Sequence, residues 1–210
     1  MVPGRRGKFA FCFTAAALPR FGCSVDELTH LLLGAADGDR DALAGFVAGT
    51  QADVWRFCAS MVGADTADDA VQETFVRAWR SVRTFRGDAS AKTWLLAIAK
   101  RVSFGMLKHR DRDTAVSGVH AGRSGQAGDT ERVADAGELV ALTDLVARLE
   151  PDRRSAFVLT QLLGLGYLEA ADVCGCPVGT IRSRVARARA DLFAAASSGE
   201  ADRSRSADGA

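Results

Sequence analysis

The sequence predicts an all-α fold of two small helical domains, and three observations support this fold class. Residues 25–112 carry apolar side chains at three- and four-residue spacing, the period of an amphipathic helix. No stretch alternates apolar and polar residues for long enough to indicate a convincing strand. Residues 113–137 are rich in Gly, Ser, Asp and Ala, so we expect a flexible linker there. The helical pattern resumes over residues 138–196, which we predict to be the second domain.

The two ends of the chain fall outside these domains. Residues 1–24 place basic side chains before a short apolar run, as a signal peptide does, but no small-residue cleavage site follows. We therefore expect an N-terminal extension, either disordered or arising from a misassigned start, and a folded protein that begins near Val25. Residues 197–210 are small and polar, and we expect a disordered tail.

Charge and cysteine content exclude some classes of protein. Lys plus Arg (27) nearly balances Asp plus Glu (26), which argues against a uniformly basic nucleic-acid coat. The five cysteines form an odd, scattered set rather than the framework of a small disulfide-stapled secreted domain. We expect free or buried thiols in a reducing cytoplasm. We also expect no membrane insertion, because the N-terminal apolar run is too short to span a bilayer.

In the first domain, residues 65–85 predict a helix with acids at its start and arginines towards its end, an order that suits the helix dipole. Helical spacing predicts a buried stripe of Val71, Phe75, Ala78, Trp79 and Val82. The other side presents polar residues that a partner could contact: Asp68, Asp69, Gln72, Glu73 and Arg77. Charge alone favours a merely solvated face.

A polar loop follows this helix, and Ser90 is expected to cap the next one. Cations and aromatics alternate from the loop into that helix, a combination that fits single-stranded DNA through phosphate pairing and base stacking. The ring of Trp94 has the spacing of a core residue, which is the alternative reading. The helix is apolar on more than one side, so we expect it to pack between neighbours.

The second domain contains "VCGCPVGTIRSRVARARADL", residues 173–192, which allows two interpretations. A short helix over residues 168–174 with Leu168 and Ala171 inward, a turn at Gly175 and a second helix after Pro177 would form a helix-turn-helix. The second helix would expose residues suited to base edges and phosphates: Thr180, Arg182, Ser183, Arg184 and Arg187. An arginine-rich solvated helix is the alternative, and the preceding turn makes it the weaker one.

The second interpretation is a metal or redox site at Cys174 and Cys176. Structural zinc normally takes four ligands, and the nearest upstream histidine, His120, falls in the predicted linker. We therefore expect no metal and no cofactor, with both cysteines serving as packing and turn residues. No nucleophile, general base and orienting group occur together in a recognisable motif, so we expect no enzymatic activity.

Taken together, these motifs resemble a bacterial sigma factor of the extracytoplasmic-function (ECF) group, which retains only regions 2 and 4. "DDAVQETFVRAW" and "TFRGDASAKTWLLAIAKR" are similar to region 2, and "GYLEAADVCGCPVGTIRSRVARAR" is similar to region 4. The second half looks most like the sigma C branch of actinobacteria. The resemblance covers residues 25–195 except the linker. Gly105 stands where the family usually carries an aspartate, which puts the end of that helix in question.

The resemblance implies two partners, core RNA polymerase (through its clamp helices and flap) and promoter DNA. Polymerase contacts would involve Asp69, Gln72, Glu73 and Arg77. Contacts to the −10 element would involve Arg86, Gly87, Asp88, Ala89, Ser90, Lys92, Lys100 and Arg101, and contacts to the −35 element Thr180, Arg182, Ser183, Arg184 and Arg187. Whether an anti-sigma factor masks these surfaces stays open.

Two alternative functions also stay open at this point. One is a conventional helix-turn-helix regulator that binds an operator and uses its first domain to dimerise or sense a ligand. The other is an exported thiol or metal protein built on the N-terminal apolar run and the two neighbouring cysteines.

Overall fold

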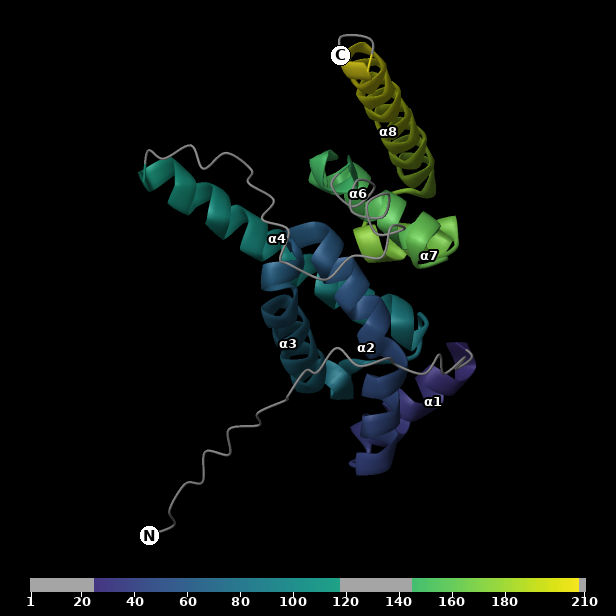
Figure 1. Cartoon of the computed structure of the whole chain (residues 1–210). Coiled ribbons are helices and arrows are strands. Elements are labelled where there is room, and N and C mark those ends of the chain that lie inside the picture. The colour runs from purple at the N-terminus through teal and green to yellow at the C-terminus, as the bar shows by residue number, and fades with distance from the viewer. Residues whose placement is uncertain (1–24, 118–144, 208–210) are drawn as a thin grey trace.

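The computed structural model describes residues 25–117 and 145–207, and every regular element within these ranges is a helix (Figure 1). We call residues 25–117 the N-terminal bundle and residues 145–207 the C-terminal unit. The bundle contains α1 (Val25–Ala36), α2 (Arg40–Val62), α3 (Ala64–Ser81), a 3-10 turn η1 (Val82–Thr84) and α4 (Ala91–Ser117). The unit contains α6 (Pro151–Phe157), a π turn η2 (Val158–Leu162), α7 (Tyr167–Cys174) and α8 (Val178–Ala207). The all-α prediction is confirmed.

Local sequence signals explain where these helices begin. The carboxylate of Asp39 accepts hydrogen bonds from the first turn of α2, and Ser90 accepts one from Thr93 N–H at 3.1 Å, as expected of a cap for α4. Gly63 separates α2 from α3 with φ of 94°, a conformation that favours glycine. Glu150 caps α6, whose first residue is Pro151, where a missing N–H costs nothing.

Helix α4 is central to the bundle, as its apolar pattern predicted. Leu95, Leu96, Ala99 and Val102 are buried, and α4 packs against α2, α3 and α7. Its first turn is also tied to α1, because Thr29 Oγ1 accepts a hydrogen bond from Ala91 N–H at 3.3 Å. The loop before α4 is therefore held at both of its ends by packed helices.

The C-terminal unit packs directly on the N-terminal bundle. In Figure 1, α6 and α7 lie between the bundle and α8, and the buried side chains of both parts form one contiguous apolar cluster. A flexible linker does not by itself predict such packing. Most of the predicted linker, residues 118–137, lies outside the described residues, as do residues 1–24.

Two predicted boundaries differ from the structure. Helix α4 continues to Ser117, beyond the predicted start of the linker at residue 113, because residues 106–117 contain neither Gly nor Pro. Helix α8 continues to Ala207, into the segment that we expected to be disordered, and no proline interrupts it there. No helix in the described part of the chain has the length and apolar character needed to cross a bilayer.

Two residues predicted to be buried are exposed. Trp79 is 48% exposed, because it lies about 40° further round α3 than Phe75, towards Gln72, at 100° per residue. Leu168 is 71% exposed, because α7 buries Ala170, Ala171 and Val173, and Leu168 falls on the opposite side of this short helix. Both side chains therefore contribute to the surface and not to the core.

Candidate nucleic-acid and protein interfaces

The outer face of α3 carries the four residues predicted to contact a protein partner. Asp69, Gln72 and Arg77 are exposed, and Glu73 is half-buried. Glu73 and Arg77 form an ion pair at 2.7 Å, one helical turn apart. This pair orients the two side chains on the helix surface, but an exposed pair of this kind adds little stability.

The sequence did not predict the apolar part of this face. Val76 is 38% exposed, and Trp79 lies within about 20° of Gln72 round the helix. A second exposed indole, that of Trp55 on α2, donates a hydrogen bond to Asp68 on α3 at 3.0 Å. Trp is enriched at protein interfaces, and acidic residues are found there mainly in the polar rim round the apolar centre. The angular position of Trp79, close to Gln72 round the helix, could have predicted that its ring is exposed.

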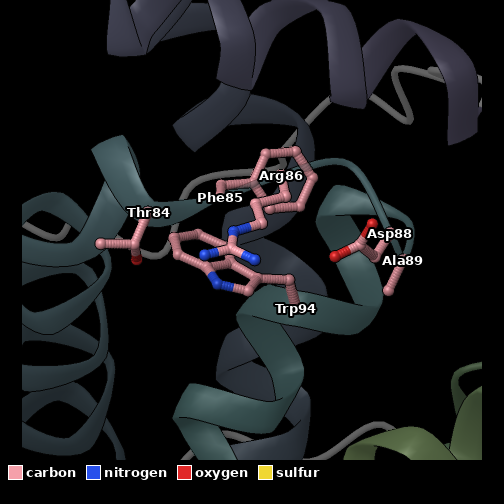
Figure 2. A pocket seen from close by; sticks show the side chains of 6 residues that line it. All are labelled: Thr84, Phe85, Arg86, Asp88, Ala89 and Trp94. Carbon is pink, nitrogen blue, oxygen red and sulfur yellow. The ribbon is translucent and has the colours of Figure 1, made fainter.

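The loop between η1 and α4 forms a pocket of about 330 Å³. Figure 2 shows its six lining residues, Thr84, Phe85, Arg86, Asp88, Ala89 and Trp94. The Phe85 and Trp94 rings meet with centroids 5.4 Å apart and planes tilted by 56°. Gly87 adopts a φ of 77° in the loop, which favours glycine. Trp94 is thus half-buried, with part of its ring in the pocket wall, so that it belongs to both the core and the surface.

The cations predicted on α4 occupy different environments. Lys92 pairs with Asp53 of α2 at 2.7 Å. Lys100 donates a hydrogen bond to the main-chain oxygen of Cys174, at 3.3 Å, and lies 4.6 Å from the centroid of the Phe104 ring. Arg101 is exposed. The structure therefore brings Arg86, Gly87, Asp88, Ala89 and Ser90 together in one loop, with Lys92 and Arg101 on the following helix, whereas Lys100 contacts the C-terminal unit.

Gly105 does not interrupt α4. The helix runs continuously to Ser117, and a Cβ atom added at Gly105 would meet nothing within 4 Å. The family aspartate could therefore be accommodated there. Its absence costs the helix some stability but does not end it.

Helices α7 and α8 form the predicted helix-turn-helix. Gly175 ends α7 with φ of 64°, and the Cys176 N–H returns to the Ala171 carbonyl at 3.2 Å, which closes the turn. Ile181, Val185 and Ala188 of α8 are buried against the rest of the unit. The predicted turn at Gly175 and the helix after it are confirmed.

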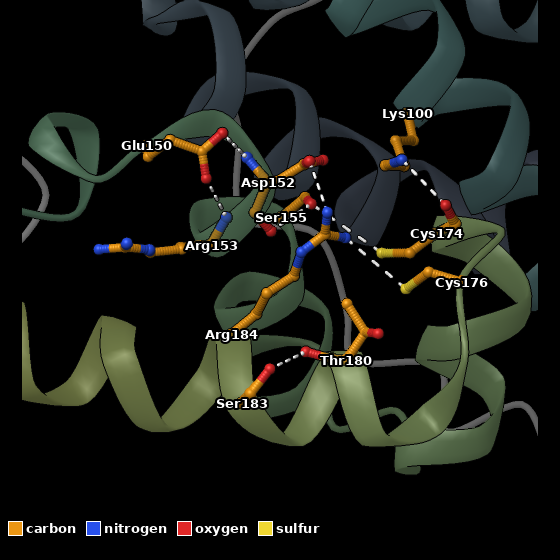
Figure 3. Close-up of polar contacts among 10 residues, drawn as sticks. All are labelled: Lys100, Glu150, Asp152, Arg153, Ser155, Cys174, Cys176, Thr180, Ser183 and Arg184. Atoms are coloured by element: carbon orange, nitrogen blue, oxygen red, sulfur yellow. Dashed lines mark hydrogen bonds and ion pairs between the residues drawn. The ribbon is translucent and has the colours of Figure 1, made fainter.

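The opposite face of α8 presents most of the predicted DNA contacts. Arg182, Ser183 and Arg187 are exposed, and Thr180 is half-buried. Ser183 Oγ donates to the Thr180 carbonyl at 2.9 Å. Arg184 instead turns inward, where it pairs with Asp152 at 2.6 Å and donates to the Cys176 sulfur at 3.6 Å (Figure 3). Arg184 therefore braces α8 against α6, and the other four residues line the surface.

The cysteines have structural surroundings. Burial raises the pKa of the Cys58 thiol to about 11, and burial likewise raises the pKa of Cys174, although nearby Lys100 opposes that shift. Cys174 Sγ lies 3.9 Å from Ser155 Oγ, and Cys176 stands in the turn. Over residues 25–117 and 145–207, no three His, Cys, Asp or Glu side chains converge as a metal site would require.

Family models match both parts of the chain. Residues 46–113 match "Sigma-70 region 2", and residues 139–192 match "Sigma-70, region 4". All predicted contact residues on α3, α4, α8 and the loop lie within these two ranges.

Known relatives agree with these matches. The chain is 49% identical over 171 residues to the probable RNA polymerase sigma-C factor of Mycobacterium bovis, covering 80% of this chain and 91% of that protein. It is 32% identical to the ECF RNA polymerase sigma-E factor of Salmonella typhimurium, covering 72% and 85%.

Two solved structures are similar to this one. The first is CnrH in complex with the cytosolic domain of CnrY, with a TM-score of 0.62, 27% identity and coverage of 83% of this chain and 99% of that chain. The second is the sigma factor RpoE in complex with the anti-sigma factor NepR from Bartonella quintana, with a TM-score of 0.60, 29% identity and coverage of 71% and 93%.

These matches confirm the resemblance to the sigma C branch and agree with the expectation that the chain is not an enzyme, because sigma factors are initiation factors. They also favour this assignment over an operator-binding regulator and over an exported thiol protein. The chain belongs to the extracytoplasmic-function sigma factors of RNA polymerase, in the sigma-70 family.

Proposed function

We propose that three surfaces of this sigma factor divide the work of promoter selection, and that the chain acts in the cytoplasm on core RNA polymerase and promoter DNA. The observation that carries the proposal is that two exposed polar helix faces and one aromatic pocket lie within the two matched regions. Each surface has chemistry suited to a different partner.

The α3 face is proposed to bind core polymerase. Asp69, Gln72 and Glu73 offer acceptors to basic or amide groups of the partner, and Arg77 supplies a donor next to Glu73. Exposed Trp79 adds apolar area of the kind that anchors protein interfaces. If this charged face contacted only solvent, the exposed indole at its edge would have no explanation.

The pocket is proposed to hold a base of the −10 element after the strands separate. Trp94 and Phe85 provide aromatic surface on which a base can stack, and Asp88 can accept hydrogen bonds from a base amino group. Arg86 and Arg101 are exposed nearby and can contact phosphates. Extruding a base costs a few kcal/mol of unstacking, which capture in such a pocket would offset.

The α8 face is proposed to read the −35 duplex through Thr180, Arg182, Ser183 and Arg187. These residues lie in the first three turns of the second helix of a helix-turn-helix, the part that enters the major groove. Arg184 was also predicted to contact DNA. Because its guanidinium pairs with Asp152, we now propose that it positions α8 against α6.

Reconstitution with purified components tests the proposal. Added to core RNA polymerase, the full chain should direct transcription from promoters mapped after its overexpression, and core polymerase alone should not. If the chain binds a specific duplex but never stimulates initiation, an operator-binding regulator is the better description.

We also propose that an anti-sigma factor binds this chain and regulates it. Its support is that the related RpoE of Bartonella quintana was solved with the anti-sigma factor NepR. Affinity purification of the full chain from its own cells, followed by identification of a protein that blocks transcription in the reconstituted assay, would test it.

A further inference from the structure

Cys174 and Cys176 lie on either side of Gly175 in the turn of the helix-turn-helix, and the proposed function uses neither of them. Both are free thiols, and both side chains are half-buried. Figure 3 shows the two sulfurs on the same side of the turn, towards the guanidinium of Arg184. Burial raises the pKa of Cys174, and the neighbouring charge of an ionised Cys176 raises it further. The two thiols therefore form one local pair.

The backbone of this turn brings the two residues within disulfide distance. Gly175 has φ of 64° and ψ of 39°, the left-handed mirror image of helical backbone. In helical geometry and in its mirror image, Cα atoms two residues apart are separated by about 5.4 Å. Disulfides usually join Cα atoms that lie about 4.4–6.8 Å apart. A bond between Cys174 and Cys176 therefore requires rotation of side chains but no separation of the two helices.

The surroundings of the two sulfurs differ. The Arg184 guanidinium donates a hydrogen bond to Cys176 Sγ at 3.6 Å, and Cys176 stands between two exposed residues of the turn. A cationic donor beside a sulfur stabilises negative charge there, and the thiolate is the form of cysteine that oxidants attack. Cys174 Sγ instead lies 3.9 Å from the neutral hydroxyl of Ser155. Cys176 is thus suited to react first, and Cys174 to react with the product.

We propose that Cys174 and Cys176 form a reversible oxidation site for hydrogen peroxide. The Cys176 thiolate attacks one peroxide oxygen, the O–O bond breaks and hydroxide leaves, which produces a sulfenic acid at Cys176. The Cys174 sulfur then attacks the Cys176 sulfur, the S–O bond breaks, and the oxygen leaves as water with the Cys174 proton. In total, two thiols lose two electrons and two protons, and one peroxide becomes two water molecules.

The disulfide should also be easily reduced. It closes a loop across a single residue, and short loops gain the least stabilisation from lost chain entropy. A small thiol reduces such a bond by exchange through a mixed disulfide. The bond should therefore form when peroxide is present and be lost when thiols are in excess.

Oxidation should act on DNA binding, a consequence that rests on the proposed function. The new bond takes Cys176 Sγ away from Arg184, which positions α8 against α6. It also closes a ring across the peptides of Gly175 and Cys176, whose N–H groups bond to carbonyls of α7. Because α8 begins at Val178, two residues after this ring, the oxidised chain should bind a −35 duplex several-fold more weakly.

Mass spectrometry of the full chain tests the site without polymerase or DNA. Trypsin releases residues 155–182 as one peptide, which contains Cys174, Cys176 and no other cysteine. After equimolar peroxide this peptide should lose the mass of two hydrogens, and dithiothreitol should restore it. The peptide of residues 57–77 should keep an unmodified thiol, because Cys58 is fully buried. An unchanged 155–182 peptide would overturn the proposal, as would a cross-link from it to another cysteine of the chain.

Two single substitutions test the order of reaction. In Cys174→Ser, Cys176 should stop at the sulfenic acid, which a dione reagent traps as an adduct. In Cys176→Ser, Cys174 should stay an unmodified thiol under the same conditions. Equal trapping in the two variants would overturn the assigned order.

The role of the guanidinium has its own variant. Arg184→Met should slow peroxide oxidation of the 155–182 peptide several-fold. Arg189→Met is the matched control and should keep the native rate, because Arg189 lies on the same helix and bonds to Gln161. An unchanged rate in a folded Arg184→Met protein would contradict this role. If that variant loses helix content by circular dichroism, the two cysteine variants still decide the proposal.

Fluorescence anisotropy with a −35 duplex from a mapped promoter tests the consequence for DNA. Peroxide should weaken binding by the native chain several-fold, dithiothreitol should restore it, and Cys176→Ser should bind equally before and after peroxide. Equal affinities of the oxidised and reduced native chains would overturn the effect on DNA. A reduced chain that binds no promoter duplex would instead count against the proposed function, and the mass measurement distinguishes the two failures.

Discussion

Replacing Arg187 with alanine should weaken use of the −35 element and leave the fold intact. The side chain is exposed, and the neighbouring Val185 and Ala188 carry the packing of α8, so the truncation opens no cavity. An arginine that pairs with a guanine contributes about 1–3 kcal/mol of discrimination, which corresponds to a loss of roughly 5- to 150-fold. If Arg187 holds a phosphate instead, the slope of log affinity against log salt should fall by about one.

The assay compares transcription from a mapped promoter with that from the same promoter carrying a scrambled −35 element, alongside a separate measurement of affinity for core polymerase. Arg189→Ala is the matched control, because Arg189 lies on the same helix and hydrogen-bonds to Gln161 at 2.6 Å within the unit. Equal losses of core affinity and of −35-dependent transcription in Arg187→Ala would refute the assignment of this face to DNA.

Two further predictions concern the other proposed surfaces, and two concern the stability of the N-terminal bundle. Glu73→Ala should lower affinity for core polymerase, measured by fluorescence titration, without changing binding of a −35 duplex. Trp94→Ala should weaken binding of the polymerase complex to melted −10 DNA by about 1–3 kcal/mol, the contribution of one stacked base, with a fully double-stranded −35 probe as control. Gly105→Ala should raise the free energy of unfolding in urea by about 1 kcal/mol, because its Cβ meets nothing within 4 Å and the helix gains propensity. Cys58 should resist alkylation in the native protein. Its pKa is raised to about 11, so the thiol of the unfolded chain ionises at a lower pH than the thiol of the folded chain. The contribution of Cys58 to the free energy of unfolding should therefore be present at pH 8 and be lost as pH rises through 11.

Local features of the fold were predictable because their signals are local. Ser90 at the start of α4 and Gly175 after α7 each satisfy or end a helix within a few residues, so the sequence alone indicates them. Helical periodicity also predicted the buried positions of Val71, Ala78 and Val82. Trp79 is an exception, because this hydrophobic residue lies close to Gln72 round α3 and is therefore exposed.

Contacts between the two parts could not be predicted from residue types. Arg154 and Lys100 bind main-chain carbonyls, which every residue carries, and their partners stand 74 to 94 positions away along the chain. Arg184 shows the same limit, since its exposure depends on Asp152, which is 32 positions distant. The sequence identifies the residue types suited to DNA, but the contacts formed on folding determine which of these side chains are exposed.

The hydrogen bond from Ala91 N–H to Thr29 determines where a fragment containing region 2 should begin. The region 2 match begins at residue 46, yet Thr29 belongs to α1, which also packs on α2 and α4. A fragment cut at residue 46 would leave the start of α4 and its loop without this support and would remove the packing of α1 on α2 and α4. Studies of isolated −10 recognition should therefore begin the fragment at Val25.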